Sequence, residues 1–319
     1  MRAGRVRALA ICGPTASGKS EFAARLAELV GGEVVNADSR QVYAGMRTGT
    51  GWPSDEQLAR APHHGYGTAA PDERYSAARF VADARAIIAQ IAERGKLPIV
   101  VGGTGLYVEA LAGSMPLDRP FANDELRERL RREAAVHPAP ALRDWLEAIA
   151  PAAAARIAPG DRYRTLRALE GALAARESPQ RRLDRNAPSE SPLASGPDTA
   201  VALTIAVLEM PRRELEARIA ERVRAMFAHG LVEEALAVRR AYGDAPALSG
   251  IGYAEALAYA DGAATRAEAL AAAIVRTRSY AKRQQTWFRR IADARRLDAL
   301  DSRTAYELAE LARGLAAAD

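Results

Sequence analysis

The sequence predicts an α/β protein in which helices flank a parallel sheet. An all-helical lobe is inserted in the chain between two strands of that sheet. Short apolar runs of the kind that form buried strands fall at Val6–Cys12 and at residues 33–37, 98–101 and 200–208. Residues 21–30, between the first two runs, carry apolar side chains at helical spacing. Strands that alternate with helices pair in parallel, because a chain that returns through a helix re-enters the sheet in the same direction.

Each boundary carries a local signal. The first apolar run ends at Gly13-Pro14, and Gly31-Gly32 ends the helical run that follows it. Glycine and proline interrupt regular structure, so these pairs divide strand, loop and helix. From Arg212 onward the chain is predicted to be helical, with turns at residues 244–252 and at Asp261-Gly262.

The helical lobe is predicted between the third and fourth strands. Residues 123–176 favour helix throughout, with interruptions at His137-Pro138 and at Pro159-Gly160. Residues 178–197, rich in Ser, Pro, Asn and Arg, have the composition of a loop. We therefore expect a first part of the core at residues 1–117, an inserted domain at 118–199, and the rest of the core with a C-terminal helical region at 200–319.

The composition indicates a cytoplasmic, globular protein. The chain has 319 residues, of which 49% are hydrophobic and 27% charged, and a net charge of +5. No run approaches the roughly 20 apolar residues of a membrane span, and no signal-peptide core follows the start. The single cysteine, Cys12, excludes an internal disulfide and a cysteine-based zinc site. The charge is compatible with a polyanionic partner without requiring one, and we expect a monomer.

A phosphate-binding loop stands between the first strand and the first helix. It follows the pattern G-x-x-x-x-G-K-[ST] and comprises Gly13, Pro14, Thr15, Ala16, Ser17, Gly18, Lys19 and Ser20. In such a loop backbone N–H groups wrap phosphate oxygens, Lys19 neutralises the terminal phosphate, and Ser20 holds Mg²⁺. The alternative is an ordinary glycine-rich turn, but the order strand, loop, helix favours a P-loop NTPase-like, nucleotide-kinase-like fold. The third strand runs into Gly102-Gly103 rather than a metal-binding carboxylate, which disfavours an ATPase.

Asp38 follows the second strand, where an open parallel sheet forms its ligand crevice. A carboxylate there can act as a general base or help to place a metal. The alternative is a helix N-cap, with Gln41 completing a capping box. Residues 102–107 (GGTGLY) leave two interpretations open in the same way: a turn capped by Thr104, or a loop that approaches a ligand closely.

These motifs together resemble the tRNA dimethylallyltransferase (tRNA isopentenyltransferase) family. The resemblance continues, in family order, through residues 75–80 (YSAARF), 164–170 (RTLRALE) and 282–289 (KRQQTWFR). It implies Mg²⁺-dependent transfer of a dimethylallyl group from dimethylallyl diphosphate to N6 of the adenosine just 3′ of the anticodon. It also implies that Thr15 and Lys19 contact the donor and that Asp38 is the general base.

Arg222 matches the family's catalytic arginine. The sequence places it beside a helical apolar stripe formed by Leu215, Ile219, Val223 and Met226. An arginine at the edge of a buried face needs an anionic partner, which a donor diphosphate would supply. The alternative is a side chain that extends to solvent.

The resemblance also implies a surface for the tRNA anticodon stem-loop. The positions that match tRNA contacts in the family are Asp38, Ser39, Arg40, Gln41, Thr104, Tyr163, Arg164, Arg167, Gly252, Tyr253, Lys282, Arg283, Gln285 and Arg289. Arg278, Lys282, Gln285 and Arg289 recur at helical spacing on one basic face, which suits a phosphate backbone. Without the resemblance, a solvated helix face explains that spacing as well. The inserted lobe would be the clamp over the stem-loop.

The chain departs from the family at Trp52, where lysine is frequent, and at His63-His64. We expect an altered loop or RNA contact at Trp52 with the chemistry intact. The two histidines are interpreted as incidental loop residues rather than metal ligands.

Three other functions stay open at this stage. An adenylate isopentenyltransferase would act on free AMP, but a mononucleotide requires neither the helical lobe nor the basic C-terminal helix. A P-loop small-molecule kinase lacks support because no metal-binding carboxylate follows the third strand. A non-catalytic RNA-binding module would not explain a phosphate-binding loop facing a carboxylate.

Overall fold

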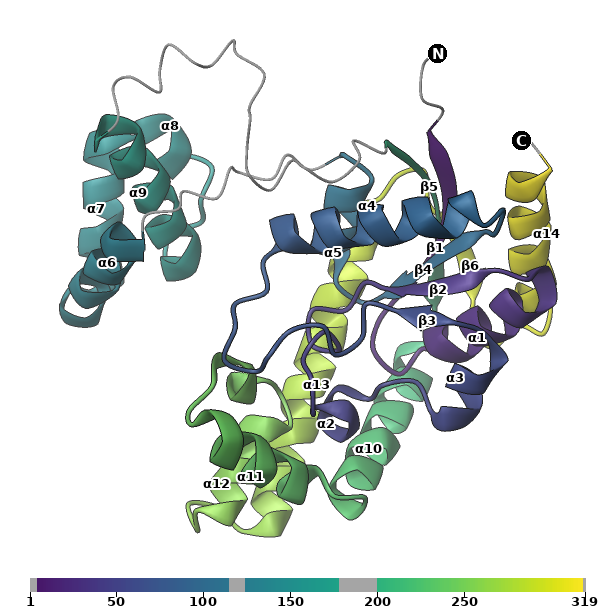
Figure 1. Cartoon of the computed structure of the whole chain (residues 1–319). Helices are drawn as coiled ribbons and strands as arrows, with labels where there is room; N and C mark the ends of the chain where they lie inside the picture. The colour runs from purple at the N-terminus through teal and green to yellow at the C-terminus, as the bar shows by residue number, and fades with distance from the viewer. Residues whose placement is uncertain (1–4, 115–123, 178–199, 318–319) are drawn as a thin grey trace. The chain divides into compact units, whose positions relative to one another are not determined.

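The computed structural model describes residues 5–114, 124–177 and 200–317 of the chain (Figure 1). The chain divides into two compact units, residues 1–117 with 193–319 and residues 118–192. The strands of the first unit are β1 (Val6–Cys12), β2 (Glu33–Asn36), β3 (His63–His64), β4 (Pro98–Gly102), β5 (Val201–Glu209) and β6 (Arg295–Asp298). Its helices are α1 (Lys19–Val30), α2 (Arg47–Thr50), α3 (Asp55–Arg60), α4 (Ala77–Glu93), α5 (Gly105–Leu111), α10 (Arg212–Ala228), α11 (Leu231–Tyr242), η2 (Pro246–Ser249), α12 (Tyr253–Ala260), α13 (Arg266–Phe288) and α14 (Thr304–Ala316).

The sheet is parallel and has the order β3-β2-β4-β1-β5-β6. β1 pairs with β4 on one side, in the register Leu9 to Ile99, and with β5 on the other, in the register Leu9 to Thr204. The helical unit is thus inserted in sequence between the two strands that flank β1. The predicted parallel α/β sheet is confirmed.

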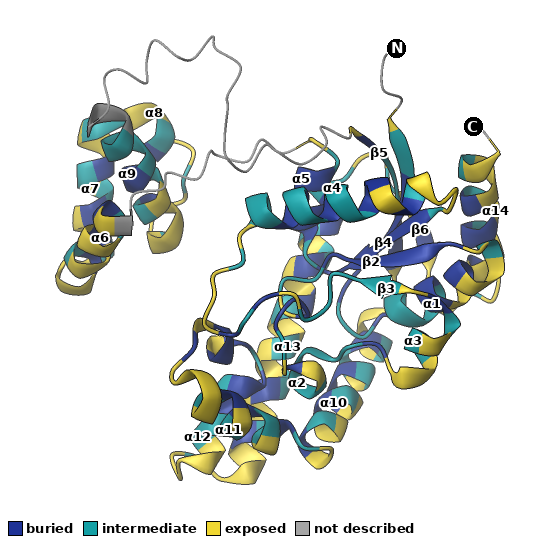
Figure 2. Cartoon of the chain, in the orientation of Figure 1, coloured by how far each residue is buried: buried dark blue, intermediate teal, exposed yellow. Residues whose placement is uncertain are grey.

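Side chains of the central strands alternate between two cores, as a pleated strand buried on both faces requires. Leu9 and Ile11 pack with α1 and α14, whereas Ala8 and Ala10 pack with α4 and α5. Figure 2 shows β2 and β4 buried between these helices, and every residue of both strands is buried. With both faces filled, the open edge at the carboxyl ends of the strands is the place for a ligand.

A third core joins α10, α11, α12 and α13 into a helical group in the first unit. Leu215, Ile219 and Val223 of α10 are buried there, as the predicted stripe requires, together with Leu231 of α11. The segment from Val42 to Met46 belongs to the same core. This helical group therefore packs directly on the loop that follows Asp38.

Two strands were missed in the sequence. The prediction that everything after Arg212 is helical is wrong at β6, which pairs with β5. Of the β6 residues only Leu297 is buried, so no apolar run marks the strand. The prediction of a loop at His63-His64 is also wrong, because these residues form β3 beside Val34 and Val35.

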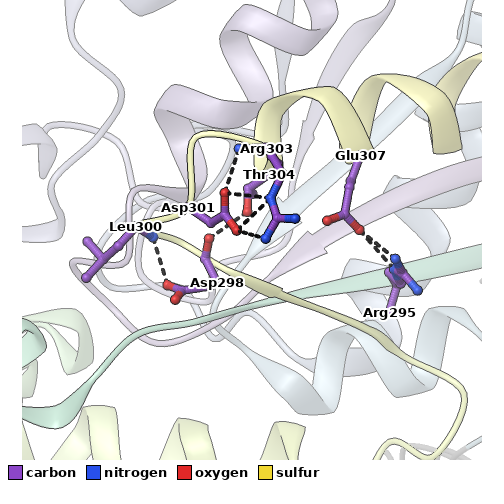
Figure 3. A network of polar contacts seen from close by, with 7 residues as sticks. All are labelled: Arg295, Asp298, Leu300, Asp301, Arg303, Thr304 and Glu307. Atoms are coloured by element: carbon purple, nitrogen blue, oxygen red, sulfur yellow. Dashed lines mark hydrogen bonds and ion pairs between the residues drawn. The ribbon is translucent and has the colours of Figure 1, made fainter.

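A polar network connects β6 to α14 (Figure 3). The Asp298 carboxylate accepts from the Leu300 N–H at 2.9 Å, and the Thr304 hydroxyl donates to the Asp298 carbonyl at 2.5 Å. Arg303 donates to Asp301 at 2.7 Å and Arg295 to Glu307 at 2.6 Å. These contacts fix the start of the helix that covers β1.

The second unit consists of α6 (Asp124–Val136), α7 (Ala139–Ile149), α8 (Pro151–Ala154) and α9 (Arg162–Glu177). The breaks predicted at His137-Pro138 and Pro159-Gly160 are both present, and a further break at Pro151 was not predicted. Leucines from α6, α7 and α9 form its core. Glu170 is buried at the edge of this core and is paired with Arg127, at 2.7 Å, and Arg167.

Within the described ranges, no helix has the length and apolar character needed to cross a membrane.

Candidate active site

The phosphate-binding loop joins β1 to α1 in the predicted order. Gly18 is the N-cap of α1, with φ 88°, and Ala16 also has a left-handed φ of 64°. The Lys19 ammonium donates to the Pro14 carbonyl at 2.6 Å, across the mouth of the loop. The first amides of α1 have no helical partner and lie at the positive end of the helix dipole, so the loop can receive a phosphate.

Asp38 stands immediately after β2 and is held by its neighbours. The Asn36 side chain accepts from the Asp38 N–H at 2.9 Å, and one Asp38 carboxylate oxygen accepts from the Arg40 N–H at 2.8 Å. Turns and an isolated bridge at Tyr43 follow Asp38, and the next helix begins only at Arg47, so the alternative of a helix N-cap with a capping box is wrong here. The Gln41 amide instead donates to the carbonyls of Thr50 and Gly51, at 3.2 and 2.7 Å.

Thr104 lies at the start of α5, as one interpretation of its motif predicts. It is the N-cap of α5, but its side chain forms no capping bond. Its hydroxyl accepts from the Ser39 N–H at 3.0 Å. Thr104 therefore fixes the chain next to Asp38.

Gln284 is a site residue that the sequence motif contained without revealing its role. Its side chain is buried on α13, where its carbonyl accepts from the Thr15 N–H at 2.8 Å and its amide donates to the Gly103 carbonyl at 2.8 Å. A Cβ on Gly103 would lie 2.2 Å from the Gln284 amide nitrogen, so this approach requires glycine. One side chain thus links the phosphate-binding loop, the loop after β4 and α13.

These elements enclose a cavity of about 480 Å³ at the carboxyl ends of β2 and β4. Its polar lining includes Thr15, Lys19, Ser20, Asp38, Ser39, Arg40, Gln41, Arg222, Arg283 and Gln284. Its apolar lining includes Met46, Ile219, Val223, Met226, Leu231, Ile251 and Tyr253, mostly from the third core. The cavity therefore offers an anion-binding side and an apolar side.

The charges of Lys19, Arg222 and Asp38 are coupled across this cavity. Burial lowers the pKa of Lys19 to about 8, and the Asp38 carboxylate opposes that change. Burial also lowers the pKa of Arg222, again opposed by Asp38. Two desolvated cations facing one carboxylate favour an additional anion, because that anion would restore both pKa values.

A second cavity of about 750 Å³ shares Lys19, Ser20 and Arg222 with the first. Trp52 lines it, with its ring edge-on to Tyr66 at 5.6 Å and the Arg47 guanidinium 5.5 Å from its ring centre. The indole N–H of Trp52 is buried and has no hydrogen-bond partner in the part of the chain that the structure describes. The departure at Trp52 therefore lies beside the phosphate-binding loop.

The two histidines are structural. His64 lies 2.7 Å from the buried carboxylate of Glu33, which also pairs with Arg94 at 2.6 Å, and His63 contacts the Ala61 carbonyl. Across the described ranges, no group of three or more His, Cys, Asp or Glu side chains is arranged to hold a metal ion.

The predicted tRNA-contacting residues fall into three groups. The first lines or borders the main cavity and comprises Asp38, Ser39, Arg40, Gln41, Thr104, Gly252, Tyr253 and Arg283. The second comprises Lys282 and Gln285 on the predicted face of α13 and Arg289 at its C-cap. Lys282 and Arg289 are exposed and Gln285 is half-buried. The third, Tyr163, Arg164 and Arg167, lies on α9 of the helical unit.

Tyr253 is a special case within the first group. Its side chain is 1% exposed, and its hydroxyl donates to the Glu234 carboxylate at 2.6 Å. The phenol hydroxyl is thus paired within the protein, while Tyr253 also lines the main cavity, so its predicted contact with tRNA stays a prediction.

Comparison with known proteins identifies the family. The chain matches the family model of IPP transferase over residues 41–291 and that of isopentenyl transferase over residues 6–63. It is 48% identical to a tRNA dimethylallyltransferase of Anaeromyxobacter dehalogenans, covering 89% of this chain and 92% of the relative. A tRNA dimethylallyltransferase of Geobacter sulfurreducens is 46% identical, with 90% of each chain covered.

Solved structures agree with this assignment. The tRNA isopentenylpyrophosphate transferase of Bacillus halodurans superimposes with a TM-score of 0.69 at 34% identity, over 98% of each chain. A eukaryotic dimethylallyltransferase acting on tRNA gives a TM-score of 0.73 at 25% identity, over 95% of this chain and 77% of the other. The fold is therefore P-loop NTPase-like, and the alternatives of an AMP-specific enzyme and a kinase are not favoured. The chain belongs to the IPP transferase family, the family of these tRNA-modifying prenyltransferases.

Proposed function

We propose that this chain transfers the dimethylallyl group of dimethylallyl diphosphate to N6 of the adenosine immediately 3′ of the anticodon in tRNA, releasing diphosphate. The observation that carries the proposal is the single cavity in which the phosphate-binding loop, with Lys19 and Ser20, faces Asp38. Family membership supports the substrates, since the relatives named above are tRNA dimethylallyltransferases.

The proposed reaction is a displacement at the first carbon of the dimethylallyl group. A bond forms between N6 and that carbon, the bond from that carbon to the bridging oxygen breaks, and its electron pair leaves with the diphosphate. The N6 lone pair is delocalised into the adenine ring, so the amine is a weak nucleophile. Asp38 would accept the N6 proton as the new bond forms, which lowers the barrier.

Lys19, Thr15 and Arg222 would hold the leaving diphosphate. All three line the cavity, and the desolvation that lowers the pKa of Lys19 and Arg222 makes an anionic ligand favourable. Charge that develops on the leaving group is stabilised most by cations already in position. The apolar residues that line the cavity, among them Met46 and Tyr253, offer room for the prenyl chain.

Mg²⁺ is part of the proposal, with Ser20 as its protein ligand. The residues fit this ion, because the Ser20 hydroxyl lies on the cavity wall beside Lys19, and Mg²⁺ at phosphates typically takes most ligands from substrate and water. When bound, it would neutralise the diphosphate and assist its departure. Chelation with EDTA should then abolish transfer, and added Mg²⁺ should restore it.

The proposed tRNA contacts follow from where the chemistry lies. An adenosine in a stacked anticodon loop must be extruded to reach Asp38, and Ser39, Arg40 and Gln41 are beside it to receive the base. The exposed face of α13 would bind phosphates. On the helical unit, Tyr163 is 74% exposed and the Arg164 side chain 62% exposed, so both are available to RNA as part of the proposed clamp.

The test is transfer from labelled dimethylallyl diphosphate with Mg²⁺, offering unmodified tRNA and AMP in parallel reactions. We expect label on tRNA alone, at the adenosine 3′ of the anticodon. Label on AMP alone would reassign the protein to cytokinin-type chemistry, and label on neither would reject prenyl transfer. We further propose that the protein acts in the cytoplasm and as a monomer, and sedimentation of the active protein would test the monomer.

A further inference from the structure

The segment of residues 47–52, here called the strap, passes between α11 and the main cavity. It consists of the single helical turn α2 followed by Gly51 and Trp52. A one-turn helix has little stability of its own, so its position must be set by contacts at its two ends.

The first end of the strap is bound by Glu234 of α11. The two oxygens of this carboxylate accept from the N–H groups of Thr48 and Gly49, at 2.8 and 2.9 Å. The Tyr253 hydroxyl donates to one of the same oxygens at 2.6 Å. Glu234 forms no ion pair with any residue of the described ranges, so strap amides and a phenol are its polar partners.

The second end of the strap contacts Arg222. One guanidinium nitrogen donates to the carbonyls of Thr50 and Gly51, at 3.4 and 3.2 Å. Gly51 has φ +62°, and a Cβ there would lie 1.8 Å from that nitrogen. The strap and Arg222 are therefore in direct contact, with no room for a side chain between them.

Among the residues that the structure describes, Arg222 has no hydrogen-bond partner besides these two strap carbonyls. It forms no ion pair with a protein carboxylate there, and its hydrogen bonds are those to the two strap carbonyls. Helix α10 fixes the position of the Arg222 backbone, whereas the hydrogen bonds to the strap fix the position of the guanidinium. The Gln41 amide donates to the same two carbonyls, so the strap connects two side chains of the cavity wall.

We propose that Glu234 is a positioning residue for the prenyl transfer reaction: by holding the strap through Thr48 and Gly49, it aims Arg222 at the donor diphosphate. The inference rests on the proposed function for the identity of the donor. Glu234 itself does not line either cavity, and it acts only through the strap.

The test is a double-mutant cycle between Glu234 and Arg222. The variants are Glu234→Ala, Glu234→Gln, Arg222→Ala and each Glu234 variant combined with Arg222→Ala, with Glu233→Gln as the matched control. Glu233 is the exposed neighbour on the same helix turn, so its change removes a charge without touching the strap. The affinity for inorganic diphosphate with Mg²⁺, measured by calorimetry, and single-turnover transfer are both read out, with thermal unfolding as a check on folding.

We expect Glu234→Ala to lower the transfer rate roughly 10²-fold, the scale on which a misplacement near 1 Å acts. Glu234→Gln keeps the shape but supplies only one acceptor oxygen, and it should lose less. In the Arg222→Ala background either Glu234 change should lower the transfer rate by less than about threefold. Both changes act through the same partner, so their effects do not add. Glu233→Gln should match the wild type.

An equal loss from the Glu234 changes with and without Arg222 would overturn the inference and leave Glu234 a purely structural residue. The Gln variant decides the matter if the Ala variant fails to fold. Diphosphate binding needs no transfer, so coupling in that measurement survives even if the wild type does not modify tRNA. If Glu234 and Arg222 are coupled in diphosphate binding but the wild type transfers no dimethylallyl group, the proposed function is rejected and the positioning role of Glu234 is retained.

Discussion

The phosphate-binding loop and the strap border the same cavities, but they acquire their shapes in different ways. In the loop two bonds are local, from the Ser17 N–H and the Lys19 ammonium to the Pro14 carbonyl, and one long-range bond joins Thr15 to Gln284. In the strap the decisive bonds reach Glu234, more than 180 residues away in the chain. A shape held by local bonds can be recognised from a short sequence motif. A shape held by long-range bonds depends on how distant helices pack.

The comparison predicts that the two regions fail differently. A change in the loop or at Asp38 should remove a group that touches a substrate and leave the rest of the site in place. A change in the strap should leave every reacting group present but displace the Arg222 guanidinium from its position at the donor diphosphate. The predictions below are ordered by expected effect and test this distinction.

The largest effect is expected for Asp38→Asn. Asparagine can still accept from the Arg40 N–H, so the local turn should persist, but it cannot accept a proton from N6. Single-turnover transfer should fall roughly 10²–10⁴-fold, the usual contribution of a general base, with little change in the dissociation constant for tRNA. Near wild-type turnover would remove Asp38 from the mechanism.

The next largest effect is expected for Gly51→Ala. The new methyl group would displace the Arg222 guanidinium, so transfer should fall roughly ten- to hundredfold. Gly45→Ala is the matched control: Gly45 has a similar φ of +72°, yet its Cβ would meet nothing within 4 Å. If both variants lose the same activity, backbone strain rather than contact with Arg222 is responsible.

The pH dependence of donor use should report Lys19. Burial places its pKa at about 8, so below that pH the side chain is charged and binds the diphosphate, and above it the charge is lost. The specificity constant for the donor reports groups of the free enzyme, so it should decrease about tenfold per pH unit above 8. A profile that stays level to pH 9.5 would mean that the Lys19 charge is unimportant for donor capture.

A small effect is expected for Lys282→Ala on the exposed face of α13. Losing one phosphate contact should weaken tRNA binding severalfold and lower the slope of log affinity against log salt by roughly 0.7–0.9. Lys96→Ala is the control, since its ammonium lies 3.3 Å from Glu33 and pairs with it. An unchanged slope for Lys282→Ala would return this helix face to an ordinary solvated surface.

Sequence reasoning found what local patterns encode. The loop at Gly13–Ser20, the strand before Asp38 and the polar face of α13 each follow from a motif or from a period of the chain. It missed β6 because that strand has a single buried apolar residue. It gave no sign that the Tyr253 hydroxyl donates to Glu234, because a hydroxyl's partner cannot be inferred from one motif.

Glu234 and Gln284 were missed for a common reason, and both left a signal. Glu234 follows the buried Leu231 by three residues and precedes the buried Ala235 and Val238 on the same side of α11. Gln284 lies between the buried Ala281 and Phe288 of α13 in the same way. A polar side chain within a buried helical stripe needs a partner, so such positions indicate long-range hydrogen bonds even when the partner is unknown.

The most direct measurement is a crystal structure of the protein with an unmodified anticodon stem-loop and the unreactive donor analogue dimethylallyl thiodiphosphate. We predict that the diphosphate occupies the loop at Lys19 and that the adenine N6 lies within hydrogen-bond reach of Asp38, roughly 2.6–3.2 Å. An adenine bound away from Asp38, or a diphosphate that leaves the phosphate-binding loop empty, would contradict the account.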